Sequence, residues 1–470
     1  MTTSTTTKLM VIGDSLGQGT QALSVTPETV KWAPANIVAK QLGWDFQNIP
    51  LDGPVIVDLE EIASDVAAGD LWTLFGIKDK IVSRLSYWEN YFKSEKGSDI
   101  PEFVHNMAVA GAEARHLYTT LDQHWATFVE SKKRVESIEF NFANIGMLIG
   151  NVVEASIAIS FVYCINPRNL PGRGSWTVLD VVEKLRPENL LVSIGHNDGI
   201  LDIVRGGVTS VDDTRVKNVM LALKPHLEKA GKSSKVYIAS YPLSRIPTAL
   251  ISSGAKVNGY YESYESFFSL TQKVSVSRSE MMASDQKVRN LNKFLRETFD
   301  RKNICILDTS DVYESIDSRH DGDGIFVFDE RLARNYFITN LVPKTKRKRI
   351  GPRSRHRRRY GPRYLEKGGL ISFDFVHPSG TGYVVYAKCF LNVLGHSLSE
   401  EDEKRLLSSA FSDDVFYSDP ENFDWIIVLI RKLKRSVSAQ AGANDASPIE
   451  STDAKLVAIE AYAKCMFGNR

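Results

Sequence analysis

Short apolar runs recur along the chain at intervals long enough to hold a helix between successive runs. Segments 178–185, 216–229 and 285–299 place apolar residues at helical spacing between these runs. Strands that alternate with helices join through right-handed crossovers and form a parallel sheet with helices on both faces. The pattern therefore predicts a three-layer α/β/α sandwich, with strands expected at residues 9–12, 103–106, 190–194, 236–239 and 304–307.

A last apolar helix is predicted over residues 383–394, and beyond Gly395 the chain becomes first acidic and then small and polar. Residues Ser397 to Glu400 resemble a capping box that opens an acidic helix. Long connections within a compact domain are usually functional or mobile. We expect a main domain at 1–395 with insertions at about 121–177 and 312–369, a helical extension at 396–435, a flexible linker at 436–454 and a C-terminal helix at 455–470.

The longest apolar stretch runs from about residue 140 to residue 165, and Asn144, Asn151 and Glu154 interrupt it. An acidic residue near the centre of a membrane-spanning helix costs about 2.5–3.5 kcal/mol. We therefore expect a buried helix, or a cap over an acyl-chain pocket, in preference to a membrane span. Residues 1–7 lack the basic and apolar regions of an ordinary secretory signal peptide, so the cytoplasm is the default expectation.

The charge of the chain is balanced overall but unevenly distributed. The sequence holds 58 Lys and Arg against 57 Asp and Glu, yet 11 of the basic residues and no acidic one lie between Lys344 and Arg363. A solvated insertion is one interpretation of this run, and contact with an anionic surface is the other. Nucleic acid is disfavoured as the partner because no recognisable nucleic-acid-binding fold accompanies the run.

The four cysteines lie far apart, with no CxxC pair and no Cys/His spacing suited to zinc. They are expected to be buried or free thiols, so a disulfide-stabilised scaffold is disfavoured. The hydrophobic fraction of 43% supplies ample material for a core and excludes wholesale disorder.

Candidate chemistry begins where the first predicted strand ends, at Gly13-Asp14-Ser15-Leu16-Gly17. A serine on a tight turn after a strand is exposed to a base. The string also fits the G-x-S-x-G nucleophile elbow of α/β-hydrolases. That fold is disfavoured, however, because only 14 residues precede Ser15 and the earlier strands it requires are missing.

A second candidate is the segment Asp374-Phe375-Val376-His377-Pro378. An Asp three residues before a His can accept a hydrogen bond from the imidazole Nδ1 and leave Nε2 free as a base. A surface turn with a helix cap is the simpler interpretation of this segment.

Two further strand ends offer hydrogen-bond donors. Gly111 follows the second predicted strand, and Asn197 follows the third. In an open parallel sheet, ligands bind at the carboxyl ends of the strands, where Ser15, Gly111 and Asn197 all fall. The neighbouring His196 is interpreted as a spacer, and Asp198 as a residue that supports the Asn197 turn.

These four segments, in this order, resemble the GDSL or SGNH hydrolase family, whose motifs they match as GDSL, NMAVAGA, GHND and DFVHP. The resemblance spans residues 13–378, and the GGLISFD stretch before His377 is similar to the lipase and esterase branch. It implies the SGNH hydrolase fold, with a flavodoxin-like parallel sheet of about five strands. Phe375 departs from the commoner DGVH form, and the Asp/Asn pair that often follows GDS is missing, which leaves the substrate open.

The resemblance also implies a role for each residue. Ser15 would be the nucleophile, His377 the base and Asp374 the residue that orients it. The Ser15 and Gly111 N–H groups and the Asn197 amide would form the oxyanion hole. We expect hydrolysis of an acyl ester or lipid, without a metal or organic cofactor. A carbohydrate O-deacetylase, an acyltransferase and a non-catalytic binding module with the same fold remain alternatives, and the oligomeric state stays open.

Overall fold

A five-stranded parallel sheet forms the centre of the protein. The computed structural model describes residues 6–413 except 22–23, 57, 59–75, 95–98, 140–144, 207, 248, 267–273, 316–325, 329–330, 334–341, 344–369 and 373–375. The strand order is β2-β1-β3-β4-β8, and all neighbouring strands are parallel. This is the order of flavodoxin-like sheets. The strands are β1 (Leu9–Gly13), β2 (Asn106–Ala108), β3 (Asn189–Ser193), β4 (Lys235–Ala239) and β8 (Ile304–Leu307).

The predicted strands are confirmed within one residue at each end, except the second. That strand covers Asn106–Ala108, whereas residues 103–106 were expected. His105 lies just before the strand: its carbonyl accepts from the Val11 N–H of β1, whereas its backbone N–H donates to the Gln47 carbonyl and its Nδ1 accepts from the Gln47 N–H. The prediction from apolar content therefore put the second strand a few residues too close to the amino terminus.

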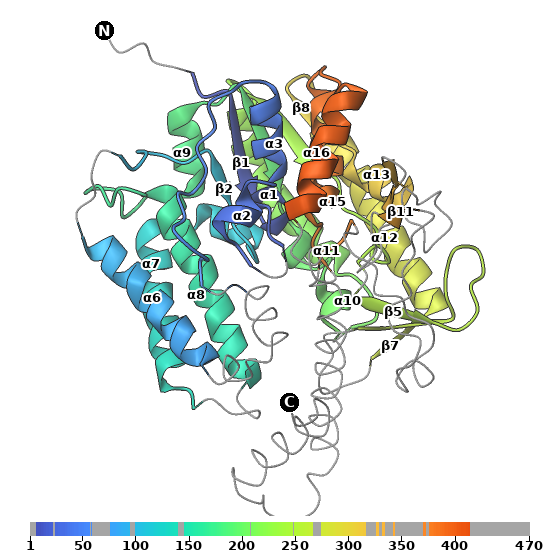
Figure 1. The fold of residues 1–470 in the computed structure, drawn as a ribbon, viewed down its shortest axis with the longest axis horizontal. Coiled ribbons are helices and arrows are strands. Elements are labelled where there is room, and N and C mark those ends of the chain that lie inside the picture. Colours follow the sequence, from blue (N-terminus) through green and yellow to red (C-terminus); the bar gives the residue numbers. More distant parts are fainter. Residues whose placement is uncertain are drawn as a thin grey trace, which may run out of the picture.

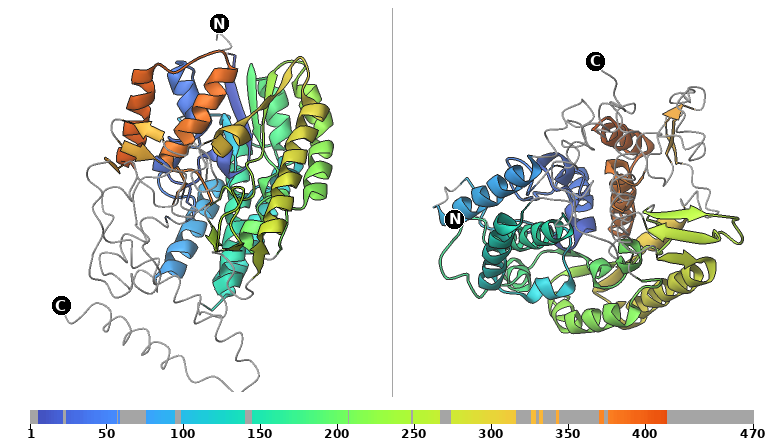
Figure 2. Two further views of the ribbon diagram at one scale, coloured as in Figure 1. Left: turned by 90° about the vertical axis from the view of Figure 1, so that its right-hand side faces the viewer. Right: turned by 90° about the horizontal axis from the view of Figure 1, so that it is seen from below.

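Helices cover both faces of the sheet, as predicted (Figures 1 and 2). On one face lie α3 (Pro34–Gln41) and α15 (Gly380–Val393), with α16 (Glu400–Asp413) outside them. On the other face lie α9 (Val178–Leu185), α11 (Asp213–Ala230) and α12 (Arg278–Phe299). The protein is therefore an α/β protein with three layers.

Local sequence explains where several of these helices begin. Thr177 and Asp180 form a capping box at α9, and Ser277 and Glu280 form another at α12. At α16 the expected box at Ser397 is wrong, because the capping serine lies two residues later: the Asp402 N–H donates to Ser399 Oγ at 3.0 Å.

The first long insertion is helical. It contains α7 (Leu121–Ser137) and α8 (Ile145–Ile165), which pack on each other, on α6 (Ile77–Lys93) and on β2. Figures 1 and 2 show these helices together, extending past one end of the central sheet. In the described part of the chain, one segment (residues 147–165 of α8) is long and apolar enough to cross a membrane, and 56% of it is buried inside the protein. The expected helix is confirmed and packs on α7 and β2, whereas a cap over an acyl-chain pocket stays a prediction.

The remaining elements are short. A small antiparallel sheet has the order β5-β6-β7, and a second has the order β11-β10-β9. Several features of the sequence lie outside the described residues: the basic run at 344–363, the expected linker at 436–454, the expected helix at 455–470, Cys465 and Asp374. The other cysteines, Cys164, Cys305 and Cys389, are free thiols, as expected. The elements are α1 (Ser15–Gln18), α2 (Pro27–Val30), η1 (Ala114–Tyr118), η2 (His196–Asp198), α10 (Asp202–Arg205), β5 (Leu250–Ser253), β6 (Ser263–Ser266), β7 (Ser275–Ser277), α13 (Thr309–Ser315), β9 (Phe326–Phe328), β10 (Arg331–Ala333) and β11 (Val342–Pro343).

Candidate functional site

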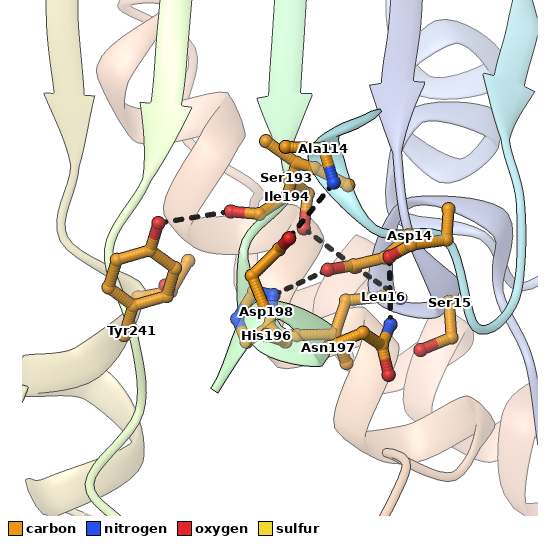
Figure 3. Close-up of polar contacts among 12 residues, drawn as sticks. Asp14, Ser15, Leu16, Ala114, Ser193, Ile194, His196, Asn197, Asp198 and Tyr241 are labelled. Atoms are coloured by element: carbon orange, nitrogen blue, oxygen red, sulfur yellow. Dashed lines mark hydrogen bonds and ion pairs between the residues drawn. The ribbon is translucent and has the colours of Figure 1, made fainter. Parts of the chain in front are cut away.

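The candidate site lies where β1 and β3 end side by side. These two strands are neighbours in the sheet although β2 separates them in the chain, which makes their carboxyl ends the topological switch point. Figure 3 shows Asp14, Ser15, His196, Asn197 and Asp198 gathered just beyond the arrowheads of the strands. The structure therefore brings Ser15 and Asn197, both predicted from the sequence, together at the carboxyl ends of β1 and β3.

The turn at Ser15 requires glycine at the preceding strand end. Gly13 has φ of +141°, and a Cβ built on it would lie 1.8 Å from the carbonyl oxygen of Ser193. The Asp14 N–H then donates to that same oxygen at 2.7 Å, which fixes the turn to β3. Ser15 follows as the first residue of α1, and its side chain is almost buried, with 3% exposed.

The Ser15 backbone N–H has no acceptor among the described residues. This is the usual condition of the first N–H groups of a helix. Asp14 caps α1 by accepting a hydrogen bond from the Leu16 N–H at 3.3 Å. The Leu16 N–H is therefore occupied, whereas the Ser15 N–H stays available. The Ser15 N–H can therefore bind an oxyanion formed beside its own side chain.

Gly111 lies on the loop after β2, which two hydrogen bonds attach to the Ser15 turn. The Val109 N–H donates to the Gly13 carbonyl at 2.9 Å, and the Ala110 N–H donates to Gln18 Oε1 at 2.6 Å. Gly111 itself has φ of +79°, and its N–H has no acceptor in the part of the chain that the structure describes. The loop thus supplies a second available N–H close to Ser15.

Two hydrogen bonds set the orientation of the Asn197 amide. Its Nδ2 donates to the Ala112 carbonyl at 3.0 Å, and its Oδ1 accepts from Arg205 at 2.8 Å. An amide nitrogen carries two hydrogens, so one Nδ2–H remains for a ligand. Because Ala112 follows Gly111 directly, the Asn197 amide and the Gly111 N–H belong to one connected unit.

Asp198 supports the loop after β2, not the Asn197 turn that was predicted for it. Its Oδ2 accepts from the Ala114 N–H at 3.0 Å. Burial raises the pKa of Asp198 to about 6, and the hydrogen bond from the Ala114 N–H opposes part of this rise. The side chain therefore holds the Gly111 loop against η2.

His196 is not a spacer, as the sequence suggested, but half of a buried pair with Asp14. Its Nδ1 lies 2.7 Å from Asp14 Oδ2, and both side chains are almost fully buried. The Tyr241 ring packs edge-on against the imidazole at a centroid distance of 5.2 Å. Its Nε2 is buried without a hydrogen-bond partner among the described residues. The sequence could have indicated this pair, because Asp14 and His196 each follow a predicted strand, and these two strands are neighbours in the sheet.

The segment that carries His377 reaches the same site through α15. His377 is buried, and its carbonyl accepts from the Ser372 N–H at 2.8 Å. Ser379 caps α15, and the Tyr383 hydroxyl one turn later donates to the Thr20 carbonyl at 2.8 Å and approaches the Ser15 carbonyl at 3.3 Å. The amino end of α15 is therefore attached to the Ser15 helix.

The structure gives no hydrogen bond between Ser15 Oγ and His377, and Asp374 lies outside the described residues. Catalytic hydrogen bonds are often longer without a substrate than with one. Among the described residues, no cluster of three or more His, Cys, Asp or Glu side chains could hold a metal ion. The described part of the site thus holds a serine hydroxyl and available N–H donors at the carboxyl ends of neighbouring strands.

Comparison of the chain with models of protein families, with curated proteins and with solved structures finds no match. The four sequence motifs and the geometry at the ends of β1, β2 and β3 are what point to a function.

Proposed function

We propose that this protein is a serine ester hydrolase of the SGNH type. The observation that supports it most strongly is that three N–H hydrogens without an acceptor among the described residues lie at the carboxyl ends of β1, β2 and β3, the same ends that carry Ser15. These are the Ser15 N–H, the Gly111 N–H and the second hydrogen of Asn197 Nδ2. Donors already fixed in place stabilise the negative charge of an acyl-transfer transition state, and each is typically worth about 10²–10³ in kcat.

In the proposed reaction, Ser15 Oγ attacks the ester carbonyl while His377 accepts the hydroxyl proton. The three N–H groups bind the oxyanion of the tetrahedral intermediate. The carbon–oxygen bond of the ester then breaks, the alcohol leaves with the proton from His377, and the acyl group remains on Ser15. Water, deprotonated by His377, releases the carboxylic acid by the same steps. Asp374 would orient the imidazole.

The first test is hydrolysis of p-nitrophenyl acyl esters by the full chain and by Ser15→Ala. The variant is expected to lose turnover, and turnover of the wild type is expected to fall at acidic pH because an imidazole base becomes protonated. Ser234→Ala is the matched control. This serine is also buried, its hydroxyl has no partner among the described residues, and it precedes the amino end of β4, at the opposite ends of the strands from Ser15.

A second readout does not depend on the choice of ester. A fluorophosphonate should label Ser15, located by mass spectrometry, in the wild type and in Ser234→Ala. Retained hydrolysis in Ser15→Ala, or labelling at another serine alone, would refute the proposed nucleophile. Product analysis with an added alcohol separates a hydrolase from an acyltransferase.

A further inference from the structure

An apolar stripe on α8 begins at the candidate oxyanion hole. Ile149, Val153 and Ile157 follow one another at intervals of four residues, which places them on one side of the helix. Ile149 is 52% exposed and Val153 is 47% exposed, whereas Ile157 is partly buried. The stripe therefore passes from a half-covered end to an open one.

The covered end touches Gly111. A Cβ built on Gly111 would lie 2.9 Å from Ile157 Cδ1 and 3.8 Å from Val153 Cγ1. The side chains of Ile157 and Val153 therefore fill the space directly beside Gly111, where a Cβ would otherwise lie. An acyl group whose carbonyl oxygen accepts from the Gly111 N–H would have its alkyl chain within reach of the stripe.

The opposite side of α8 packs into the protein, so the exposure of the stripe is not a sign of a loose helix. Ala155, Ala158, Ile159 and Val162 are buried, and α8 packs on α7 and β2. Glu154, beside the stripe, accepts from Ser131 Oγ at 2.9 Å and lies 3.6 Å from Arg134. Its charge is thus directed towards α7.

We propose that Ile149, Val153 and Ile157 bind the alkyl chain of a medium- or long-chain acyl ester. This inference rests on the proposed function, because it assumes that the ester carbonyl occupies the Ser15, Gly111 and Asn197 site. Eight residues of helix span about 12 Å at 1.5 Å per residue, which matches an extended medium-length alkyl chain. The substrate class is therefore a lipophilic ester, not an acetyl ester.

The test compares p-nitrophenyl decanoate with p-nitrophenyl acetate for the wild type and for Ile149→Gln/Val153→Gln. Both positions are half exposed and glutamine favours helix, so the variant should fold. Its kcat/KM ratio of decanoate to acetate should fall about tenfold, since contact equivalent to about two methylenes is lost. Leu221→Gln on α11 is the matched control, because Leu221 is 46% exposed and lies on another helix.

Binding of decanoic acid to Ser15→Ala, measured by calorimetry with and without the two glutamines, separates this inference from the proposed function. If no ester is hydrolysed but the glutamines still weaken decanoate binding, the proposed function fails and the acyl-chain site stands. If acetate and decanoate are hydrolysed with a ratio that the glutamines do not change, the acyl-chain site is overturned and the hydrolase stands. Weakened binding to neutral phospholipid vesicles without a change in the ratio would also overturn it, and would assign the stripe to a lipid surface.

Discussion

The close approach of Ile157 to Gly111 is the starting point of the proposed acyl-chain site, and Gly111→Ala tests it. Alanine at φ of +79° costs about 1–2 kcal/mol for the left-handed backbone alone. The new methyl group would also meet Ile157 Cδ1 at 2.9 Å and Cγ1 at 3.3 Å. Overpacking of this kind costs about 1–3 kcal/mol. Because the Ile157 terminus can rotate, we expect the contact to add about 1 kcal/mol.

Gly172→Ala is the matched control. Gly172 has φ of +78°, and a Cβ built there meets nothing within 4 Å, so the variant carries the same backbone cost without the contact. The entropy that alanine removes from the unfolded chain cancels between the two variants. The free energy of unfolding, from urea titration followed by circular dichroism, should therefore be about 1 kcal/mol lower for Gly111→Ala than for Gly172→Ala.

Ile157→Ala completes a double-mutant cycle. Truncation at Ile157 removes both atoms that the new methyl group would meet, so Gly111→Ala should cost about 1 kcal/mol less in that background. Equal costs for Gly111→Ala and Gly172→Ala, together with a coupling energy below about 0.3–0.5 kcal/mol, would refute the contact. The starting point of the acyl-chain site would then be wrong as well.

Two further predictions concern buried histidines. Asp14→Ala leaves both ring nitrogens of His196 without a partner among the described residues, so it should lower the free energy of unfolding by about 3–5 kcal/mol. Asp14→Asn keeps an acceptor oxygen and should cost less. Equal costs of the two variants in urea titration would contradict the pairing of Asp14 with His196. Burial lowers the pKa of His116 and of His124 to about 4, so the unfolded chain binds protons first and stability is lost as pH falls from 6.5 towards 4. His124→Phe, which preserves stacking on Phe161, should remove about 3 kcal/mol of that loss between pH 7 and pH 4; an unchanged pH dependence would show that His124 is not the cause.

Much of the fold could be predicted from the periodicity of the sequence. Strand β8 and helix α9 have the predicted bounds, because both are short apolar segments whose pattern is visible in the local sequence. Strand β2 was misplaced because its start depends on His105 bonding to Gln47, which is distant in the sequence. In the insertion at 121–177 the apolar stretch predicted the helix that the structure shows as α8, but not which elements it packs on, since its packing on α6, α7 and β2 joins segments distant in the sequence.

The sequence by itself determined the order of the strands and helices and the positions of Ser15, Gly111 and Asn197 at strand ends, because apolar periodicity and turn residues are local properties. Only the tertiary structure decided which strand ends meet. It placed β3 beside β1, paired His196 with Asp14 and brought Ile157 to Gly111. These contacts join residues far apart in the chain, and each depends on distances that packing of the whole sheet and its helices sets.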